Sequence, residues 1–122
     1  MNAKELRIGN LVIWNGDPEE SGLICPIDGE DIDKMERSEF YSKEHSPIPL
    51  TEEWLLKFGL NPANSGWYSI DTRKFEFEIL LRDGKYKVYV YNSYLCDIFY
   101  VHQLQNLYFA LTSEELIMKE EK

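Results

Sequence analysis

Residues 98–113 read IFYVHQLQNLYFALTS and contain no Asp, Glu, Lys or Arg, although 29% of the 122-residue chain is charged. We interpret this stretch as the end of a strand followed by a helix from Val101 to about Leu111 that is covered on more than one side. On a helical wheel, five side chains fall within an arc of about 120°: Val101, Leu104, Leu107, Tyr108 and Leu111. This arc predicts an apolar stripe packed on a β-sheet.

The opposite side of the same helix predicts a second contact surface. His102, Gln105, Asn106 and Phe109 are spaced at i, i+3, i+4 and i+7, so they share a face. Amides, a neutral imidazole and a phenyl ring leave water at lower cost than the charged residues of an ordinary exposed face. Two hypotheses follow: the face packs on the N-terminal hairpin, with Gln103, Gln105 and Asn106 bonded to backbone edges, or these four residues bind a partner protein.

The segment before this helix predicts an antiparallel meander. Apolar and charged residues alternate from Lys74 to Arg82, and Asp83-Gly84 is a strong hairpin signal. Tyr86–Tyr91 and Tyr94–Tyr100 read as the next two strands, and Gly66–Ile70 as a further one. We expect three or four strands with the C-terminal helix packed on them.

A short helix is expected from Thr51 to Phe58. Thr51 is a favoured N-cap, two glutamates follow it where the helix dipole favours negative charge, and Gly59 supplies a stop. Trp54, Leu55 and Phe58 share one face, which should anchor this helix to the sheet.

The N-terminal part predicts a β-hairpin and a polar connector. Leu11–Trp14 and Gly22–Ile27 read as two strands of a small, bent sheet, as in SH3-like barrels. Residues 28–46 carry seven acids and three bases, so we expect a solvated acidic connector with one strand or helical turn at most. The whole pattern indicates the α+β class, with one domain at 1–118 and a frayed charged tail at 119–122.

The charge balance bears on possible partners. Twenty-two acidic and thirteen basic residues give a formal charge of −9, which repels phosphate backbones and anionic membranes. We therefore expect no nucleic acid and no membrane as partner, whereas a protein partner is compatible with this charge. The chain lacks an apolar window of 18 residues and a secretion signal, so we expect a cytoplasmic protein with Cys25 and Cys96 reduced.

No constellation predicts a catalytic or metal site. Cys96 and Asp97 alternate to opposite faces of a strand, which makes a nucleophilic triad with His102 awkward. Cys25, His45, Cys96 and His102 lack the close pairs of a zinc site. Residues 28–39 depart from a calcium loop at the fifth and sixth positions. We expect no catalytic residue, metal or cofactor.

Tyrosines are abundant in the C-terminal half, and aromatic side chains on a sheet can stack nucleic-acid bases. Only Arg82, Lys85 and Lys87 lie near them in the sequence, and the protein is acidic. We therefore interpret these aromatic residues as core and sheet-face packing.

Three segments resemble a family of small uncharacterised bacterial proteins common in gut anaerobes and in their prophages and other mobile elements. They are KELRIGNLV at 4–12, PIPLTEEWLLKFG at 47–59 and YVHQLQNLYFALT at 100–112. The resemblance implies a genomic setting and no known activity, cofactor or catalytic residue. This chain has Ser113 where the family usually has Gly, which argues against a glycine-type backbone there.

We expect a non-enzymatic interaction or accessory protein, with a mobile-element setting implied by the resemblance. One alternative is an acidic inhibitor, or nucleic-acid mimic, of a basic host enzyme, since the chain is strongly acidic. The other is a small hydrolase that uses His102, which would require a cleft holding this imidazole beside a carboxylate or Cys96.

Overall fold

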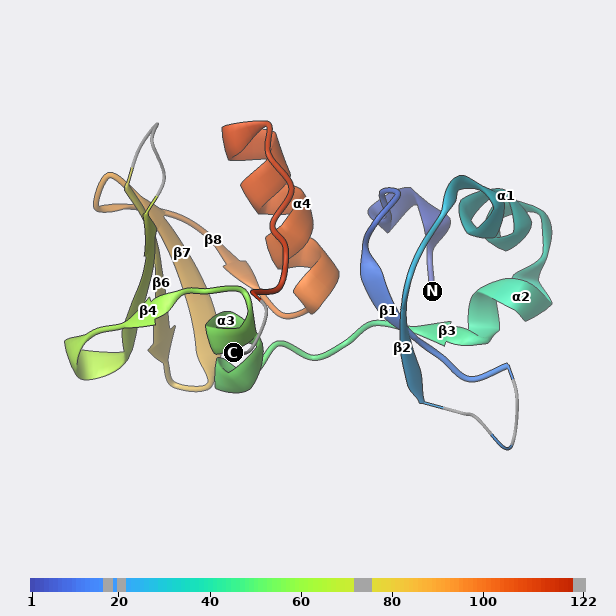
Figure 1. Ribbon diagram of the computed structural model, residues 1–122, viewed down its shortest axis with the longest axis horizontal. Coiled ribbons are helices and arrows are strands. Elements are labelled where there is room, and N and C mark those ends of the chain that lie inside the picture. Colours follow the sequence, from blue (N-terminus) through green and yellow to red (C-terminus); the bar gives the residue numbers. More distant parts are fainter. Residues whose placement is uncertain (17–18, 20–21, 72–75, 120–122) are drawn as a thin grey trace. The chain divides into compact units, whose positions relative to one another are not determined.

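The computed structural model describes residues 1–16, 19, 22–71 and 76–119 and has the predicted α+β architecture (Figure 1). Two compact units make up the chain: Met1–Pro49 with Tyr100–Leu107, and Leu50–Phe99 with Tyr108–Lys122. The expectation of one domain over 1–118 stays a prediction. Of the expected frayed tail, residues 120–122 lie outside the described residues, while the Lys119 N–H donates to the Lys57 carbonyl at 2.8 Å.

The first unit contains an open three-stranded sheet of order β2-β1-β3. The predicted hairpin is confirmed: β1 (Leu11–Trp14) pairs antiparallel with β2 (Leu23–Pro26). β1 also pairs with β3 (His45–Ser46), a two-residue strand from the segment expected to be a connector. A 3-10 turn, η1 (Ala3–Glu5), precedes the hairpin. Because the outer strands β2 and β3 do not pair with each other, the described strands close no SH3-like barrel.

The expectation of an acidic connector at 28–46 is wrong, because the segment forms two helices, α1 (Gly29–Arg37) and α2 (Glu39–Lys43). The Asp28 and Asp31 side chains form a reciprocal capping box at the start of α1. Along the helix, ion pairs at i, i+4 join Glu30 to Lys34 at 3.3 Å and Asp33 to Arg37 at 3.0 Å. The acids therefore serve helix formation, and a helix replaces the calcium-loop pattern weighed above.

The core of the first unit joins its N-terminal turn, hairpin and α1. It consists of Ala3, Leu6, Val12, Ile27 and Met35, with Met1, Cys25, Ile32 and Tyr41 packed at its margin. Val12 is the β1 residue of this core, opposite Cys25 on β2. One face of the small sheet is thereby buried under the segments that flank it in sequence.

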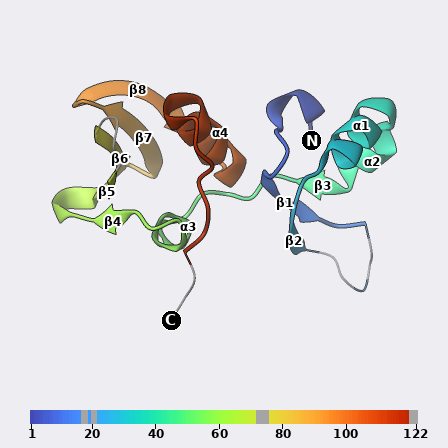
Figure 2. The same cartoon turned by 45° about the horizontal axis from the view of Figure 1, so that its top comes forward.

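The second unit begins with the predicted short helix, α3 (Glu52–Lys57), capped by the Thr51 hydroxyl. Its Trp54 and Leu55, with Phe58 at its end, are buried as expected. A five-stranded antiparallel sheet of order β4-β5-β6-β7-β8 follows (Figure 2), and its bounds are β4 (Asn61–Pro62), β5 (Trp67–Asp71), β6 (Glu76–Arg82), β7 (Lys85–Val90) and β8 (Ser93–Ile98). A 3-10 turn, η2 (Asn64–Gly66), joins β4 to β5. The meander is confirmed, although the first predicted residues of β6, 74 and 75, lie outside the described residues.

The register of this sheet separates a core face from an outer face. Phe77, Ile79, Val88 and Ile98 alternate onto the core face and are fully or almost fully buried. α3 meets this face where the Tyr68 hydroxyl donates to Glu52, and Tyr108 packs edge-on against Phe77 at a centroid distance of 6.0 Å. In β8, Leu95 is an extra residue, because Val88 pairs with Cys96 and Tyr89 with Tyr94. Leu95 is thus the residue of a β-bulge.

The C-terminal helix α4 (Val101–Thr112) forms as predicted, and the division between the two units falls within it. Residues 112–115 have the spacing of a capping box, but the helix ends at Thr112 and none restarts there. The Thr112 hydroxyl instead accepts the N–H of Glu114 and donates to the Tyr108 carbonyl. Ser113 adopts φ 62°, the left-handed conformation that its lack of a glycine argued against.

Candidate functional site

Two predicted contact residues on α4 are bound to the N-terminal segment of the first unit. The Gln105 side-chain oxygen accepts the Leu11 N–H at 2.9 Å, and its amide nitrogen donates to the Gly9 carbonyl at 3.3 Å. Asn106 accepts from the Asn10 amide at 2.8 Å and from Arg7 at 3.1 Å, and it donates to the Glu5 carbonyl at 2.9 Å. The hypothesis of bonding to a backbone edge of the N-terminal hairpin is confirmed for Gln105 at Leu11. Asn106 instead bonds to residues 5–10, which precede the hairpin. Gln103, the third amide, accepts instead from the Tyr100 N–H in its own first turn.

His102, the third residue of the predicted face, is only 1% exposed. Its Nε2 lies 3.8 Å from a Glu5 carboxylate oxygen, and its ring stacks on Tyr100 at a centroid distance of 5.8 Å. Burial lowers the pKa of His102, and the nearby Glu5 opposes this effect. A neutral, enclosed imidazole is suited to packing, and substrate cannot reach it as the hydrolase hypothesis requires.

Phe109, the fourth predicted residue, lies in the second unit and is 36% exposed. Gln105, Asn106 and His102 thus contact other residues of the first unit. Of the four predicted residues, only Phe109 is substantially exposed. Binding of a partner by these four residues stays a prediction, but only a small part of their surface is accessible.

A second polar cluster in the first unit joins α1, α2 and β3. The Tyr41 hydroxyl donates to Asp31 at 2.6 Å, and the buried His45 donates from Nδ1 to the Tyr41 carbonyl at 3.1 Å. Burial alone would raise the pKa of Asp31, but the bonds from Tyr41 and Asp28, together with His45, hold it below its ordinary value. The Asp31 bond and burial raise the pKa of Tyr41 well above its usual range. This cluster ties the two short helices to the sheet.

The cysteines do not support a nucleophilic site. Burial, followed by the charge of Asp31, raises the pKa of Cys25, and burial with Asp97 raises that of Cys96, so both thiols stay protonated at neutral pH. Cys96 pairs with Val88 of the core face and Asp97 with Lys87 of the other, which confirms their expected opposite orientation. Within the described ranges, no three His, Cys, Asp or Glu side chains are grouped to hold a metal ion.

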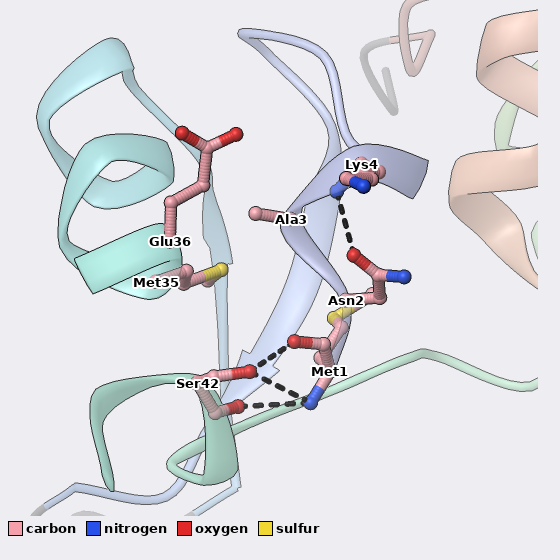
Figure 3. A pocket seen from close by; sticks show the side chains of 7 residues that line it. All are labelled: Met1, Asn2, Ala3, Lys4, Met35, Glu36 and Ser42. Atoms are coloured by element: carbon pink, nitrogen blue, oxygen red, sulfur yellow. Dashed lines mark hydrogen bonds between the residues drawn. The ribbon is translucent and has the colours of Figure 1, made fainter. Parts of the chain in front are cut away.

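A cavity of about 430 Å³ opens between the N-terminal residues and α1 and α2 (Figure 3). Its lining is Met1, Asn2, Ala3, Lys4, Met35, Glu36 and Ser42. The Met1 ammonium group donates to the Ser42 carbonyl and hydroxyl oxygens, and Lys4 and Glu36 are the charged side chains of the lining. Two cations and one carboxylate, with no His or Cys among the lining residues, do not form a nucleophile–base pair.

The outer face of the second unit's sheet presents a row of aromatic side chains. We define it by the residues that alternate with the core face: Trp67, Ser69, Glu76, Glu78, Leu80, Arg82, Lys85, Lys87, Tyr89, Tyr94 and Asp97. The ring centroids of Trp67 and Tyr89 are 5.0 Å apart and those of Tyr89 and Tyr94 are 5.8 Å apart. Tyr94 is 54% exposed. Aromatic residues of this kind are favoured in the centres of protein interfaces.

Acidic and basic residues lie toward opposite ends of β6 and β7, although Asp97 of β8 lies beside Lys87. Glu76 and Glu78 lie at the beginning of β6, whereas Arg82 ends β6 and Lys85 begins β7. None of these four has an ion-pair partner within the described part of the chain. At the basic end, a cavity of about 300 Å³ is lined by Leu80, Arg82, Asp83, Lys87 and Tyr89.

The sequence predicts which residues of β6 and β7 lie on this face, but it does not predict that the aromatic residues there are exposed. The alternation in β6 and the Asp83-Gly84 turn correctly assign the faces of β6 and β7. Trp67 comes from β5, which the alternation describes only weakly, and its contact with Tyr89 reaches across β6. The tyrosines were therefore interpreted as packing, although Tyr94 in fact lies largely in solvent.

No described helix is long and apolar enough to cross a membrane. Comparisons of the chain with models of protein families, with curated proteins and with solved structures found no match. Functional arguments for this chain therefore depend on its own residues.

Proposed function

We propose that the chain is a non-enzymatic interaction protein that binds a protein partner through the outer face of its five-stranded sheet. The observation that carries this proposal is the row of Trp67, Tyr89 and Tyr94 on the same face as Arg82 and Lys85, two cations for which the described residues supply no ion pair. Lys87 lies over the Tyr94 ring at 5.4 Å, so apolar and cationic groups are presented together. Tyr, Trp and Arg are the residues most often found to dominate binding energy.

The other candidate functions have weaker support. A hydrolase would need an accessible His102, which is buried. An acidic inhibitor would need a continuous field of carboxylates, whereas Glu30 and Asp33 of α1 are paired with Lys34 and Arg37. The free thiols at Cys25 and Cys96 favour a cytoplasmic location within this proposal. The resemblance of 47–59 and 100–112 to mobile-element proteins favours that genomic setting.

The proposal is tested by capture from a lysate of the source cell with three tagged proteins. They are the natural chain, an outer-face variant Lys87→Ala/Tyr94→Ala, and a control variant Phe40→Ala at an exposed aromatic of the first unit. We expect a defined set of proteins that the control retains and the outer-face variant loses. A set that the outer-face variant retains unchanged would contradict the proposal, as would specific capture that depends on Phe40.

A further inference from the structure

The cavity of about 300 Å³ on the outer face lies near the turn of the β6–β7 hairpin. Leu80 and Lys87 are opposite each other in this pair, so their side chains share a face. Arg82 and Tyr89 each lie two residues further along their strands and therefore join them on it. Leu80 is only 7% exposed, which gives the cavity an apolar base. Asp83, from the turn, is the remaining lining residue.

Cations are concentrated at this end of the hairpin without a matching number of acids. Residues 82–87 contain three cations and a single acid, in a chain with a formal charge of −9. Arg82 and Lys85 are directly opposite each other, and like charges at such positions destabilise a sheet. The described residues supply no ion pair to Arg82, Lys85 or Lys87. An arrangement that destabilises the fold and forms no internal ion pair is expected where another molecule binds.

Two acids lie close to these cations but leave a surplus of positive charge. Asp97 is beside Lys87 in the register, yet its carboxylate accepts the Tyr94 hydroxyl at 2.8 Å and forms no ion pair with a described residue. Asp83 lines the cavity with Arg82 and Lys87, so the lining has two positive charges and one negative charge. The surplus of one positive charge matches a single carboxylate.

We propose that the cavity binds one glutamate side chain of the partner protein. This proposal rests on the proposed function and names the chemical group that the outer face recognises. The Arg82 guanidinium can donate two parallel hydrogen bonds to a carboxylate, and Lys87 adds a second positive charge. The methylenes of the glutamate pack on Leu80 and on the Tyr89 ring.

The same lining predicts which anions are disfavoured. A phosphate group carries about −1.5 to −2 charges near neutral pH, which exceeds the surplus in the cavity, and Asp83 repels the excess. Glu78 and Asp97 lie on the same face and repel the further phosphates of a nucleic acid. A strongly acidic partner is disfavoured by the charge of −9 on the whole chain. We therefore expect the bound glutamate to be an isolated acid among apolar residues that cover the row of aromatic side chains.

The test titrates blocked tripeptides into the isotope-labelled full chain and follows its NMR chemical shifts. Acetyl-Leu-Glu-Leu-amide is the probe, and two matched controls contain Gln or phosphoserine in place of Glu. We expect the probe to cause saturable shifts at the Arg82 Nε–H, Lys87 and Tyr89, with a dissociation constant of about 1–10 mM that rises with ionic strength. Both control peptides should bind at least about fivefold more weakly than the probe. A third control, acetyl-Leu-Gln-Leu with a free terminal carboxylate, should also bind more weakly, because the proposal names a side chain and not a chain end.

Two substitutions that remove the same charge locate the site. Arg82→Gln removes a cation of the lining, and Lys85→Gln removes the cation opposite it, which is outside the lining. Both side chains are exposed, so each variant should keep the amide spectrum of the folded chain. We expect Arg82→Gln to weaken binding of the Glu peptide at least about fivefold and Lys85→Gln less than about twofold.

Four outcomes overturn the proposal: no saturable shift at about 20 mM of the Glu peptide, equal binding of the Gln peptide, equal or tighter binding of the phosphoserine peptide or of the free chain end, and equal losses in the two variants. If the Glu peptide does not bind while capture from the lysate still depends on the outer face, the glutamate proposal is wrong and the proposed function stands. If capture does not depend on the outer face, the proposed function is wrong whatever the peptides show.

Discussion

The polar face of α4 and the outer face of the five-stranded sheet both combine polar with aromatic side chains, but they differ in charge and in where their polar groups find partners. On α4, Gln105 and Asn106 have five hydrogen bonds to residues 94–101 positions away in sequence. On the sheet, Glu76, Glu78, Arg82 and Lys85 have no ion-pair partner in the described part of the chain. Neutral amides can be satisfied by backbone groups inside a fold, whereas unpaired long charged side chains beside aromatic rings remain available to another molecule.

The largest expected effect tests the internal use of the α4 face. Gln105→Ala removes a side chain that is 4% exposed and that bonds to both the Leu11 N–H and the Gly9 carbonyl. We expect the free energy of unfolding to fall by about 2–4 kcal/mol in denaturant titrations. The control Gln103→Ala, two residues earlier, should cost less than about 1 kcal/mol. Equal losses of unfolding free energy in the two variants would show that the bonds from Gln105 to the N-terminal segment add no stability of their own.

His102 should make the stability of the protein sensitive to mild acid. Its pKa is lowered by burial, so the unfolded chain takes up a proton first as pH falls through the ordinary value of 6.5. Stability is therefore complete above this pH and declines below it. In His102→Leu we expect the loss of unfolding free energy between about pH 7.5 and 5.5 to shrink, measured by the same titrations. An unchanged pH dependence would show that His102 does not cause it.

Tyr41→Phe tests the cluster around Asp31. Loss of the hydroxyl should lower the free energy of unfolding by about 1 kcal/mol at pH 7, a modest value because both groups are half-exposed. The pKa of Asp31 is lowered in the folded state, so its stabilisation is present above its ordinary value of 3.8 and is lost as pH falls below it. The variant should lose less stability than the natural chain between about pH 5 and 3. Parallel losses would contradict this assignment.

Ser113→Gly should stabilise the protein by about 0.5–1 kcal/mol, because a left-handed residue without Cβ is not strained. The observed φ of 62° and the bond from the Ser113 N–H to the Phe109 carbonyl at 2.8 Å form a helix end of the type that glycine favours. Thermal unfolding of this variant and of Ser113→Ala measures the effect. If Ala gives the same gain, strain is not its cause.

The smallest effect is expected on the outer face. Arg82→Ala should change the free energy of unfolding by less than about 0.5 kcal/mol at micromolar protein concentration, because its exposed side chain has no described partner. A loss above about 1 kcal/mol would show that Arg82 is held within its own chain, and the contrast with Gln105 would fail.

Much of the fold could be predicted from local patterns. Thr51 with its following glutamates, the Asp83-Gly84 turn and the alternation of β6 each depend on neighbours in sequence, and each prediction held. The prediction for residues 28–46 was wrong because their acidic side chains were interpreted only as solvent-exposed charges. Their spacing in fact supplies a capping box and two i, i+4 pairs, a signal that was present in the sequence.

The contact surfaces were harder to predict because they depend on distant residues. The bond between Gln105 and Leu11 follows from the fold and not from any local pattern, so the helical wheel left both internal packing and partner binding open. The outer face depends on the contact between Trp67 of β5 and Tyr89 of β7 across β6. No spacing of residues in the sequence predicts this contact. Burial of His102 was likewise invisible, since the same residue type serves in cores and in catalysis.

The bulge at Leu95 bears on what kind of assembly the chain can form. β8 is an edge strand, and a regular edge offers a ladder on which further strands from other copies add without limit. The extra residue breaks the regular spacing of backbone donors and acceptors along that edge. Growth of the sheet sideways, by addition of strands from further copies, is thus discouraged.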